Sequence, residues 1–295
     1  MAITDKKKGV WGLDQVYNKK MQGGIWQVTH ASPLLFAWGR NNESNSNGDL
    51  GLNDGTHRSS PVQLPGTTWN IFNSSTYGGN TIIGRTDGTL WMWGLNNEGQ
   101  IGQNSVTGGY SGPSSPVQLP GTTWTFGTGA GMATKTDGTL WAWGYNSRGV
   151  LGQNNRTDRS SPVQIPGTNW ATGRRKFTRG YETITAIKTD GTLWSWGSNS
   201  YGQLGLNQAI GQLHRASSPV QVGGGTDWDV VVQQPDSTWA SGAIKTDGTL
   251  WVWGRASSPG SKGGALGQNN LTPRSSPVQI PGTTWVNATF GYHNA

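Results

Sequence analysis

An eight-residue motif, a turn followed by two tryptophans and a glycine, recurs four times in this 295-residue chain. It reads DGTLWMWG from Asp87, and DGTLWAWG, DGTLWSWG and DGTLWVWG from Asp137, Asp190 and Asp247. A degenerate copy, VTHASPLLFAWG, starts at Val28. The second aromatic of each copy is Trp38, Trp93, Trp143, Trp196 or Trp253, at steps of 50 to 57 residues. A period of this length indicates repeated structural units that bury their faces only against their neighbours.

The sequence pattern of each repeat indicates four short β-strands. TIIGRT (81–86) and TLWMWG (89–94) flank Asp87-Gly88, a hairpin signal because Asp-Gly tolerates the positive φ of tight turns. A third strand, SSPVQLPG, ends in Pro and Gly, which favours an edge position. The stretch after TTW supplies a fourth strand. Side chains of the Asp residues are expected to bond the nearby turn backbone. Four strands per repeat without helical periodicity predict the blade of a β-propeller.

Tryptophan is expected to supply the core that aliphatic residues do not. Only 32% of the residues are hydrophobic, but there are 17 tryptophans, and a buried indole removes about 150–250 Å² from water. We therefore expect the repeated indoles to pack blade against blade. The residues assigned this role are Trp38, Trp91, Trp93, Trp141, Trp143, Trp194, Trp196, Trp251 and Trp253.

The two ends of the repeat region are complementary. The first repeat lacks a strand opening with TTW, and the chain closes with TTWVNATFGYHNA, which is such a strand alone. We predict that this segment completes the first blade and closes the ring, which would leave no exposed sheet edge there. The fold prediction is an all-β, five-bladed propeller over residues 25–295, preceded by an arm over 1–24. The residues predicted to close the ring are Trp285, Gly291, Tyr292 and Val28.

No pattern in the sequence favours catalysis. Cysteine is absent, the four histidines occupy no recurring position, and the turn aspartates are not paired, so no catalytic, cofactor-binding or metal-binding residues are predicted. No run of apolar residues is long enough to cross a membrane, and no signal peptide is recognisable, so we expect synthesis in a cytoplasm. The net charge of +7 is dispersed, and nucleic-acid binding is not expected.

DGTLWAWGYNSRGVLGQN followed by SSPVQIPG resembles the repeat of the regulator of chromosome condensation (RCC1) family. The resemblance covers about residues 25–295. It implies a β-propeller, often of seven blades, so five is a departure. Functions in that family include nucleotide exchange on a small GTPase, chromatin binding, protein inhibition and light reception. Fold alone does not select among them.

A second resemblance lies in the arm. KKGVWGLDQVYNKKMQGGIW (7–26) resembles segments of tail-fibre and other virion proteins of marine bacteriophages. It implies a virion protein whose arm binds other virion proteins. Trp11, Leu13 and Tyr17 are the predicted anchor residues. The alternative is an arm that is only a flexible extension.

Loops that differ between repeats are where a partner surface is expected. The predicted ligand-surface residues are Trp239, Tyr110, Asn45 and Arg255. The main hypothesis is a non-enzymatic bacteriophage virion protein of tail, fibre or baseplate, oligomeric in the particle, which binds host glycan, a receptor or another virion protein. The alternatives are a capsid decoration protein and a cellular protein-binding propeller of the exchange-factor or inhibitor type. An enzyme acting on glycans would need paired carboxylates, which the sequence does not offer.

Overall fold

The structure is a computed structural model. The chain divides into two units, Met1–Pro33 and Leu34–Ala295, and every residue that the structure describes lies in the second unit. The described residues are 34–41, 48–70, 80–109, 111–128, 131–180, 182–208, 210, 215–232, 239–255, 264 and 266–290. The predicted arm over 1–24 therefore lies outside them. So do eight residues of the predicted sites, namely Trp11, Leu13, Tyr17, Val28, Asn45, Tyr110, Gly291 and Tyr292.

The strands β1 to β18 form five antiparallel sheets, here called sheets I to V in chain order. Sheet I pairs β1 (Phe36–Gly39) with β2 (Arg58–Gln63). Sheet II holds β3 (Trp69–Asn70), β4 (Asn80–Arg85), β5 (Leu90–Gly94) and β6 (Val117–Gln118). Sheet III holds β7 (Trp124–Thr128), β8 (Met132–Lys135), β9 (Leu140–Gly144) and β10 (Arg159–Gln164). Sheet IV holds β11 (Phe177–Arg179), β12 (Thr183–Ile187), β13 (Leu193–Ser198) and β14 (Arg215–Gln221). Sheet V holds β15 (Trp228–Val231), β16 (Ala240–Lys245), β17 (Leu250–Gly254) and β18 (Arg274–Ile280).

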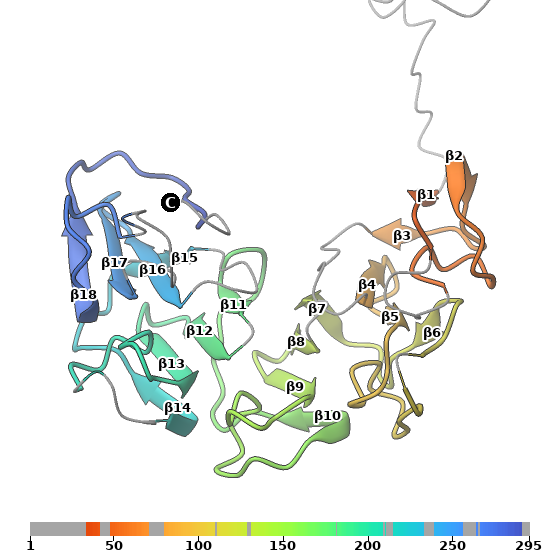
Figure 1. Cartoon of the computed structure of the whole chain (residues 1–295), viewed down its shortest axis with the longest axis horizontal. Coiled ribbons are helices and arrows are strands. Elements are labelled where there is room, and N and C mark those ends of the chain that lie inside the picture. Colours follow the sequence, from red (N-terminus) through yellow and green to blue (C-terminus); the bar gives the residue numbers. More distant parts are fainter. Residues whose placement is uncertain are drawn as a thin grey trace, which may run out of the picture. The chain divides into compact units, whose positions relative to one another are not determined.

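Strands pair in sequence order within each four-stranded sheet (Figure 1), as the repeat predicts. The strand of the octet is third, and the SSPVQ strand is the outer edge, where a proline costs no ladder hydrogen bond. Neighbouring sheets touch through their first and second strands, since β4 contacts β7 and β12 contacts β15. Four strands per sheet confirm the prediction of blade-like units.

The turn between the second and third strands differs in detail from the sequence prediction. It is a three-residue Thr-Asp-Gly loop in which the Gly88 N–H donates to the Arg85 carbonyl at 3.1 Å. Gly88 has φ 78°, whereas Asp87 is not among the residues with positive φ. The aspartate contributes through its side chain instead, because its Oδ1 accepts the Thr89 N–H at 3.0 Å. That side-chain bond to the turn backbone was predicted.

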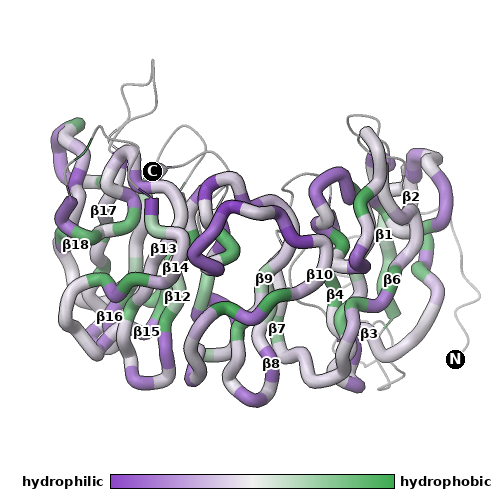
Figure 2. Tube along the Cα trace, turned by 90° about the horizontal axis from the view of Figure 1, so that it is seen from below, coloured by the Kyte–Doolittle hydropathy of each residue, from purple (hydrophilic) through white to green (hydrophobic). Residues whose placement is uncertain are grey.

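The second tryptophan of each octet joins one sheet to the preceding unit. Its indole is buried and donates a hydrogen bond to a carbonyl about 45 residues earlier. The four bonds run from Nε1 of Trp93, Trp143, Trp196 and Trp253 to the carbonyls of Asp49 (2.9 Å), Gln100 (2.7 Å), Val150 (2.8 Å) and Gln203 (2.9 Å). A glycine two residues after each carbonyl makes room for the ring: a Cβ on Gly205 would lie 2.9 Å from Trp253 Nε1. Figure 2 shows the hydrophobic residues along the strands and hydrophilic residues in the loops.

Sheet I has two strands, and the aromatic residues of its octet copy are exposed. Trp38 is 61% exposed and Phe36 46%, whereas Trp93, Trp143, Trp196 and Trp253 are at most 2% exposed. The C-terminal segment from Pro281 begins like a first strand, because the Trp285 N–H donates to the Gly248 carbonyl at 3.0 Å, as Trp228 does to Gly191. Phe290 is buried against sheet V, while Trp285 is 37% exposed.

Ring closure by the C-terminal segment stays a prediction, because two of the four residues predicted to close the ring lie beyond Phe290 and one precedes Leu34.

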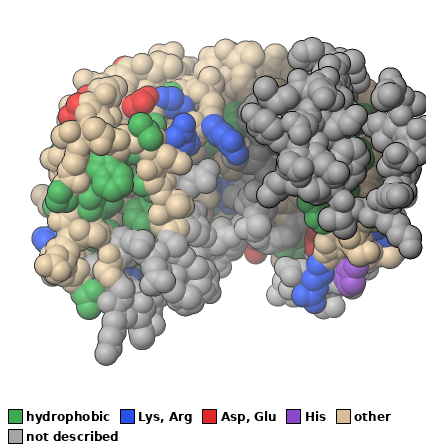
Figure 3. Space-filling model, turned by 90° about the horizontal axis from the view of Figure 1, so that it is seen from above, with side chains coloured by type: hydrophobic (Ala, Val, Ile, Leu, Met, Phe, Trp, Pro, Cys, Tyr) green, Lys and Arg blue, Asp and Glu red, His purple; other side chains and the backbone are tan. Residues whose placement is uncertain are grey.

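Hydrophobic side chains, with Lys and Arg beside them, are visible on the face seen in Figure 3. Trp285 and Val286 are the exposed large hydrophobic residues of the C-terminal segment.

Candidate functional site

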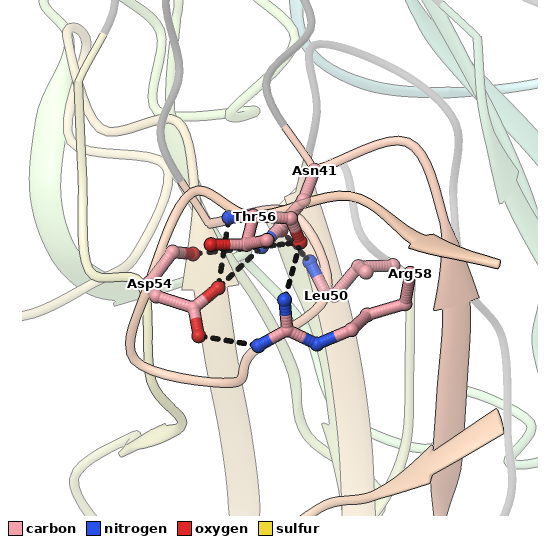
Figure 4. Close-up of polar contacts among 5 residues, drawn as sticks. All are labelled: Asn41, Leu50, Asp54, Thr56 and Arg58. Carbon is pink, nitrogen blue, oxygen red and sulfur yellow. Dashed lines mark hydrogen bonds and ion pairs between the residues drawn. The ribbon is translucent and has the colours of Figure 1, made fainter. Parts of the chain in front are cut away.

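A buried asparagine organises the loop that follows each of the strands β1, β5, β9 and β13. In sheet I, Asn41 is 0% exposed, and its Nδ2 donates to the carbonyls of Asp54 at 2.7 Å and Thr56 at 3.2 Å (Figure 4). Its Oδ1 accepts the Leu50 N–H at 2.7 Å. Asp54 also pairs with Arg58 at 2.5 Å, and the Thr56 N–H lowers the pKa of the Asp54 carboxyl. The same amide-to-Oδ1 bond recurs at Asn96, Asn146 and Asn199.

These asparagines hold the loops in a fixed shape, so residues at equivalent loop positions can vary without disturbing the frame. This is a structural role, and its sequence signal is the W-G-x-N spacing of the first four copies, whereas the fifth copy has Ala256 in place of the asparagine.

A cation lies against two indoles in each four-stranded sheet. In sheet III, Lys135 Nζ is 4.7 Å from the Trp124 ring centroid and 4.1 Å from that of Trp141. Trp124 also meets Trp141 and Trp143 edge to face, with both centroid distances 6.2 Å. Arg85, Lys188 and Lys245 occupy the equivalent positions. No sequence pattern predicted a role for these cations, although each stands two residues before the turn aspartate.

The first indole of the octet is also fixed by the turn. Trp141 Nε1 donates to the Thr139 hydroxyl at 2.8 Å, and that hydroxyl donates to Asp137 Oδ1 at 2.6 Å. The chain of bonds is repeated at Trp91, Trp194 and Trp251. The first indoles are therefore fixed to the turn of their own sheet, and the second indoles join neighbouring units.

Two neighbouring junctions use different side chains at the same positions. We define the junction surface as Arg148, Glu182, Tyr201, Trp239 and Arg255, all of them half-buried. Arg148 and Tyr201 are the second residues after the buried asparagine of their loops, and Glu182 and Trp239 stand eight residues before their turn aspartates.

An ion pair bridges the first of these junctions, because Arg148 Nε lies 2.9 Å from Glu182 Oε1. An aromatic pair bridges the second: the Tyr201 and Trp239 ring centroids are 5.2 Å apart at an interplanar angle of 48°. The Arg255 guanidinium covers both rings, 4.4 Å from the Tyr201 centroid and 4.8 Å from the Trp239 centroid. The structure thus brings together two of the predicted ligand-surface residues, Trp239 and Arg255.

Glu98 occupies the equivalent position one unit before Arg148 and two units before Tyr201. Burial, and secondarily the negative charge of Asp158, raises the pKa of the Glu98 carboxyl, and Arg179 partly opposes this. Arg179 is held by backbone carbonyls, since its Nη1 donates to Trp143 O at 2.9 Å and its Nη2 to Tyr145 O at 2.9 Å.

In the part of the chain that the structure describes, no group of three or more His, Asp or Glu side chains could hold a metal ion. Within the same residues, no helix is long and apolar enough to cross a membrane. What this arrangement offers is a rigid frame that carries half-exposed Tyr, Trp and Arg side chains.

Four-stranded antiparallel sheets that dock side by side through their inner strands are the blades of a β-propeller repeat protein. The model of the regulator of chromosome condensation (RCC1) repeat matches residues 137–173 and 190–233, so these segments are RCC1 repeats. The yeast RCC1 protein Prp20, solved bound to Kap60, superposes with a TM-score of 0.70 at 16% identity over 88% of this chain and 61% of that chain. Human WBSCR16 superposes with a TM-score of 0.59 at 18% identity over 85% of this chain and 67% of that one. The fold is therefore that of RCC1-like propellers.

Two curated relatives are similar in sequence. The mitochondrial RCC1 domain-containing protein RUG3 of Arabidopsis thaliana is 28% identical over 255 residues, which are 83% of this chain and 44% of that protein. The X-linked retinitis pigmentosa GTPase regulator homolog of Caenorhabditis elegans is 32% identical over 104 residues, 34% of this chain and 7% of that protein. The chain spans less than half the length of these relatives.

Proposed function

We propose that the protein is a non-enzymatic, protein-binding propeller and that its partner lies on the junction surface. The observation that carries the proposal is the Tyr201–Trp239–Arg255 cluster. Tyr, Trp and Arg are the residues most enriched among those that dominate protein–protein binding energy. They stand here on a frame of fixed loops and repeated junctions, at equivalent positions whose residues differ from unit to unit.

The relatives reported above favour a cellular protein-binding propeller over the virion protein of our main sequence hypothesis. One relative bears the name of a GTPase regulator, and a yeast Prp20p structure is described together with binding to Gsp1p and histones. The virion hypothesis depends on residues 7–26, outside the described residues, and stays a prediction.

Binding of Gsp1p and of core histones to the immobilised chain, followed by biolayer interferometry, tests the proposal. Trp239→Ala should weaken binding of the recognised protein at least tenfold. Leu271→Ala, which removes a 50% exposed side chain elsewhere, should leave binding unchanged. Equal binding by both variants contradicts the proposal. It is also contradicted if Trp239→Ala removes sugar binding on a glycan array but leaves protein binding unchanged.

We also infer that five blades close into a ring through the C-terminal segment. In sheet III, Trp124 packs against both octet indoles, Trp141 and Trp143. The corresponding residues at the ends of the chain are Trp285, Phe36 and Trp38, and all three are exposed. Pairing the segment with sheet I would bring these three aromatic residues together as in the complete sheets.

A further inference from the structure

Two units have a glutamine at the same loop position, Gln100 and Gln203. The side-chain N–H of this glutamine has an acceptor in the first of these units and has none among the described residues in the second. In sheet II's loop, Gln100 Oε1 accepts the Glu98 N–H at 2.9 Å. Its Nε2 donates to Asn97 Oδ1 at 2.8 Å and to the Glu98 carboxylate at 3.2 Å. The amide is thus satisfied on both sides, and a carboxylate is one of its partners.

Gln203 is the equivalent residue beside Tyr201. Its Oε1 accepts the Tyr201 N–H at 2.8 Å, so the amide is held in the same way. Ser200 and Tyr201 replace the asparagine and the glutamate, and neither supplies the acceptor. Gln203 is 1% exposed, and its Nε2 has no hydrogen-bond partner among the described residues.

Arg255 supplies a second donor beside the Tyr201–Trp239 pair. Its guanidinium lies over the Tyr201 ring, and its backbone N–H donates to the Trp239 carbonyl at 2.9 Å. Its Nη1 is buried and has no hydrogen-bond partner in the described part of the chain. Buried donors of this kind are normally paired. Two donors, one neutral and one cationic, therefore flank one aromatic pair.

We propose that Gln203 and Arg255 bind a carboxylate of an Asp or Glu side chain from the partner protein, with Tyr201 and Trp239 as its walls. A carboxylate only accepts hydrogen bonds and has two oxygens, so it can take an amide N–H and a guanidinium N–H together. Glu98 provides the precedent within this chain, because its carboxylate already accepts from the equivalent glutamine. The net charge of +7 favours an acidic partner. The inference rests on the proposed function and names the chemistry that the junction surface recognises.

The probe is the peptide acetyl-Gly-Glu-Gly-amide, with acetyl-Gly-Gln-Gly-amide as its neutral match. Binding is followed through the Trp239 indole N–H signal in NMR of the ¹⁵N-labelled chain, assigned with Trp239→Phe. The Glu peptide should shift this signal with at least tenfold higher affinity than the Gln peptide. Arg255→Gln should abolish the difference, whereas Arg156→Gln, the same change at an exposed arginine, should preserve it.

Tyr201→Glu guards against a variant that merely fails to fold. It recreates the Glu98 arrangement and supplies an internal acceptor to Gln203, so the chain should stay folded and lose Glu-peptide binding. Equal shifts from both peptides, or loss of binding in Arg156→Gln, would overturn the proposal. Glucuronate binding more tightly than the Glu peptide would overturn it in favour of an acidic glycan.

The two proposals can fail separately. If the Glu peptide binds at Trp239 while Gsp1p and histone binding ignore Trp239→Ala, the carboxylate site stands and the protein-binding role falls. If protein binding depends on Trp239 but the two peptides bind alike, the role stands and the carboxylate site falls.

Discussion

Each turn aspartate is the first residue of a short chain of hydrogen bonds that ends on an indole. The Thr89 hydroxyl donates to Asp87 Oδ1 at 2.7 Å and accepts from Trp91 Nε1 at 2.9 Å. This explains why Asp, Thr and Trp are constant in the octet while the residue between the two tryptophans changes. The Thr hydroxyl bond, followed by the Thr backbone N–H, lowers the pKa of Asp87, Asp137, Asp190 and Asp247.

Acid should therefore weaken all four turns together. Because the pKa of these carboxyls is lower in the folded state, their stabilisation is complete above the ordinary value of 3.8 and is lost as pH falls below it. We expect a variant with the four Asp→Asn changes to lose less thermal stability than the unchanged chain when the pH falls from about 5 to about 2.5. This range spans the ordinary pKa of an aspartate carboxyl. Parallel curves of melting temperature against pH would contradict the assignment.

Thr192 tests the middle of one chain of bonds. Thr192→Val keeps the shape of the side chain, but it leaves Trp194 Nε1 without its acceptor and removes the donor to Asp190. The free energy of unfolding should fall by about 1 kcal/mol, the lower end of the cost of leaving a buried polar group unpaired, because Trp194 is only half-buried. Thr192→Ser, which keeps the hydroxyl, is the control in denaturant titration and should cost clearly less.

At the scale of the element, the sequence predicted most of the blade, because local patterns determine it. The Asp-Gly turn and the Pro-containing edge strand are local signals, and the strands that they predict occur where they were expected. The cation between two indoles was not predicted, since its partner Trp124 is eleven residues from Lys135 and only strand pairing brings them together. Likewise, Tyr201 and Trp239 became neighbours through the docking of two sheets, which the spacing of residues does not encode.

The glycine next to each inter-unit indole should resist substitution. Gly205→Ala places a Cβ 2.9 Å from Trp253 Nε1 and strains a residue with φ 69°. Gly223→Ala shares the strain, at φ 62°, but has no atom within 4 Å of the new Cβ. The difference in unfolding free energy between the two variants isolates the crowded contact, and we expect it to be about 1–3 kcal/mol. Equal costs would show that the indole moves aside freely.

At the scale of the whole molecule, ring closure makes Trp38 the decisive residue. If the C-terminal segment completes sheet I, Trp38→Ala should cost about as much as the same change at a buried Trp such as Trp196, roughly 3–5 kcal/mol. If Trp38 stays 61% exposed, Trp38→Ala should lower the free energy of unfolding far less. If the ring closes, deletion of residues 283–295 should also lower the melting temperature. Unfolding in denaturant with Trp196→Ala as reference gives the answer, and a change of a few tenths of a kcal/mol for Trp38→Ala would refute closure.

The inter-unit indole meets the same partner at the four seams that the structure describes: a carbonyl, and a glycine two residues later. At this contact any unit can therefore accept any other. Recombination between two near-identical octets in the gene would add or remove about fifty codons, and every remaining seam would still match. The pairs at the junction surface, Arg148 with Glu182 and Tyr201 with Trp239, differ from one seam to the next. They would record the order in which copies were kept.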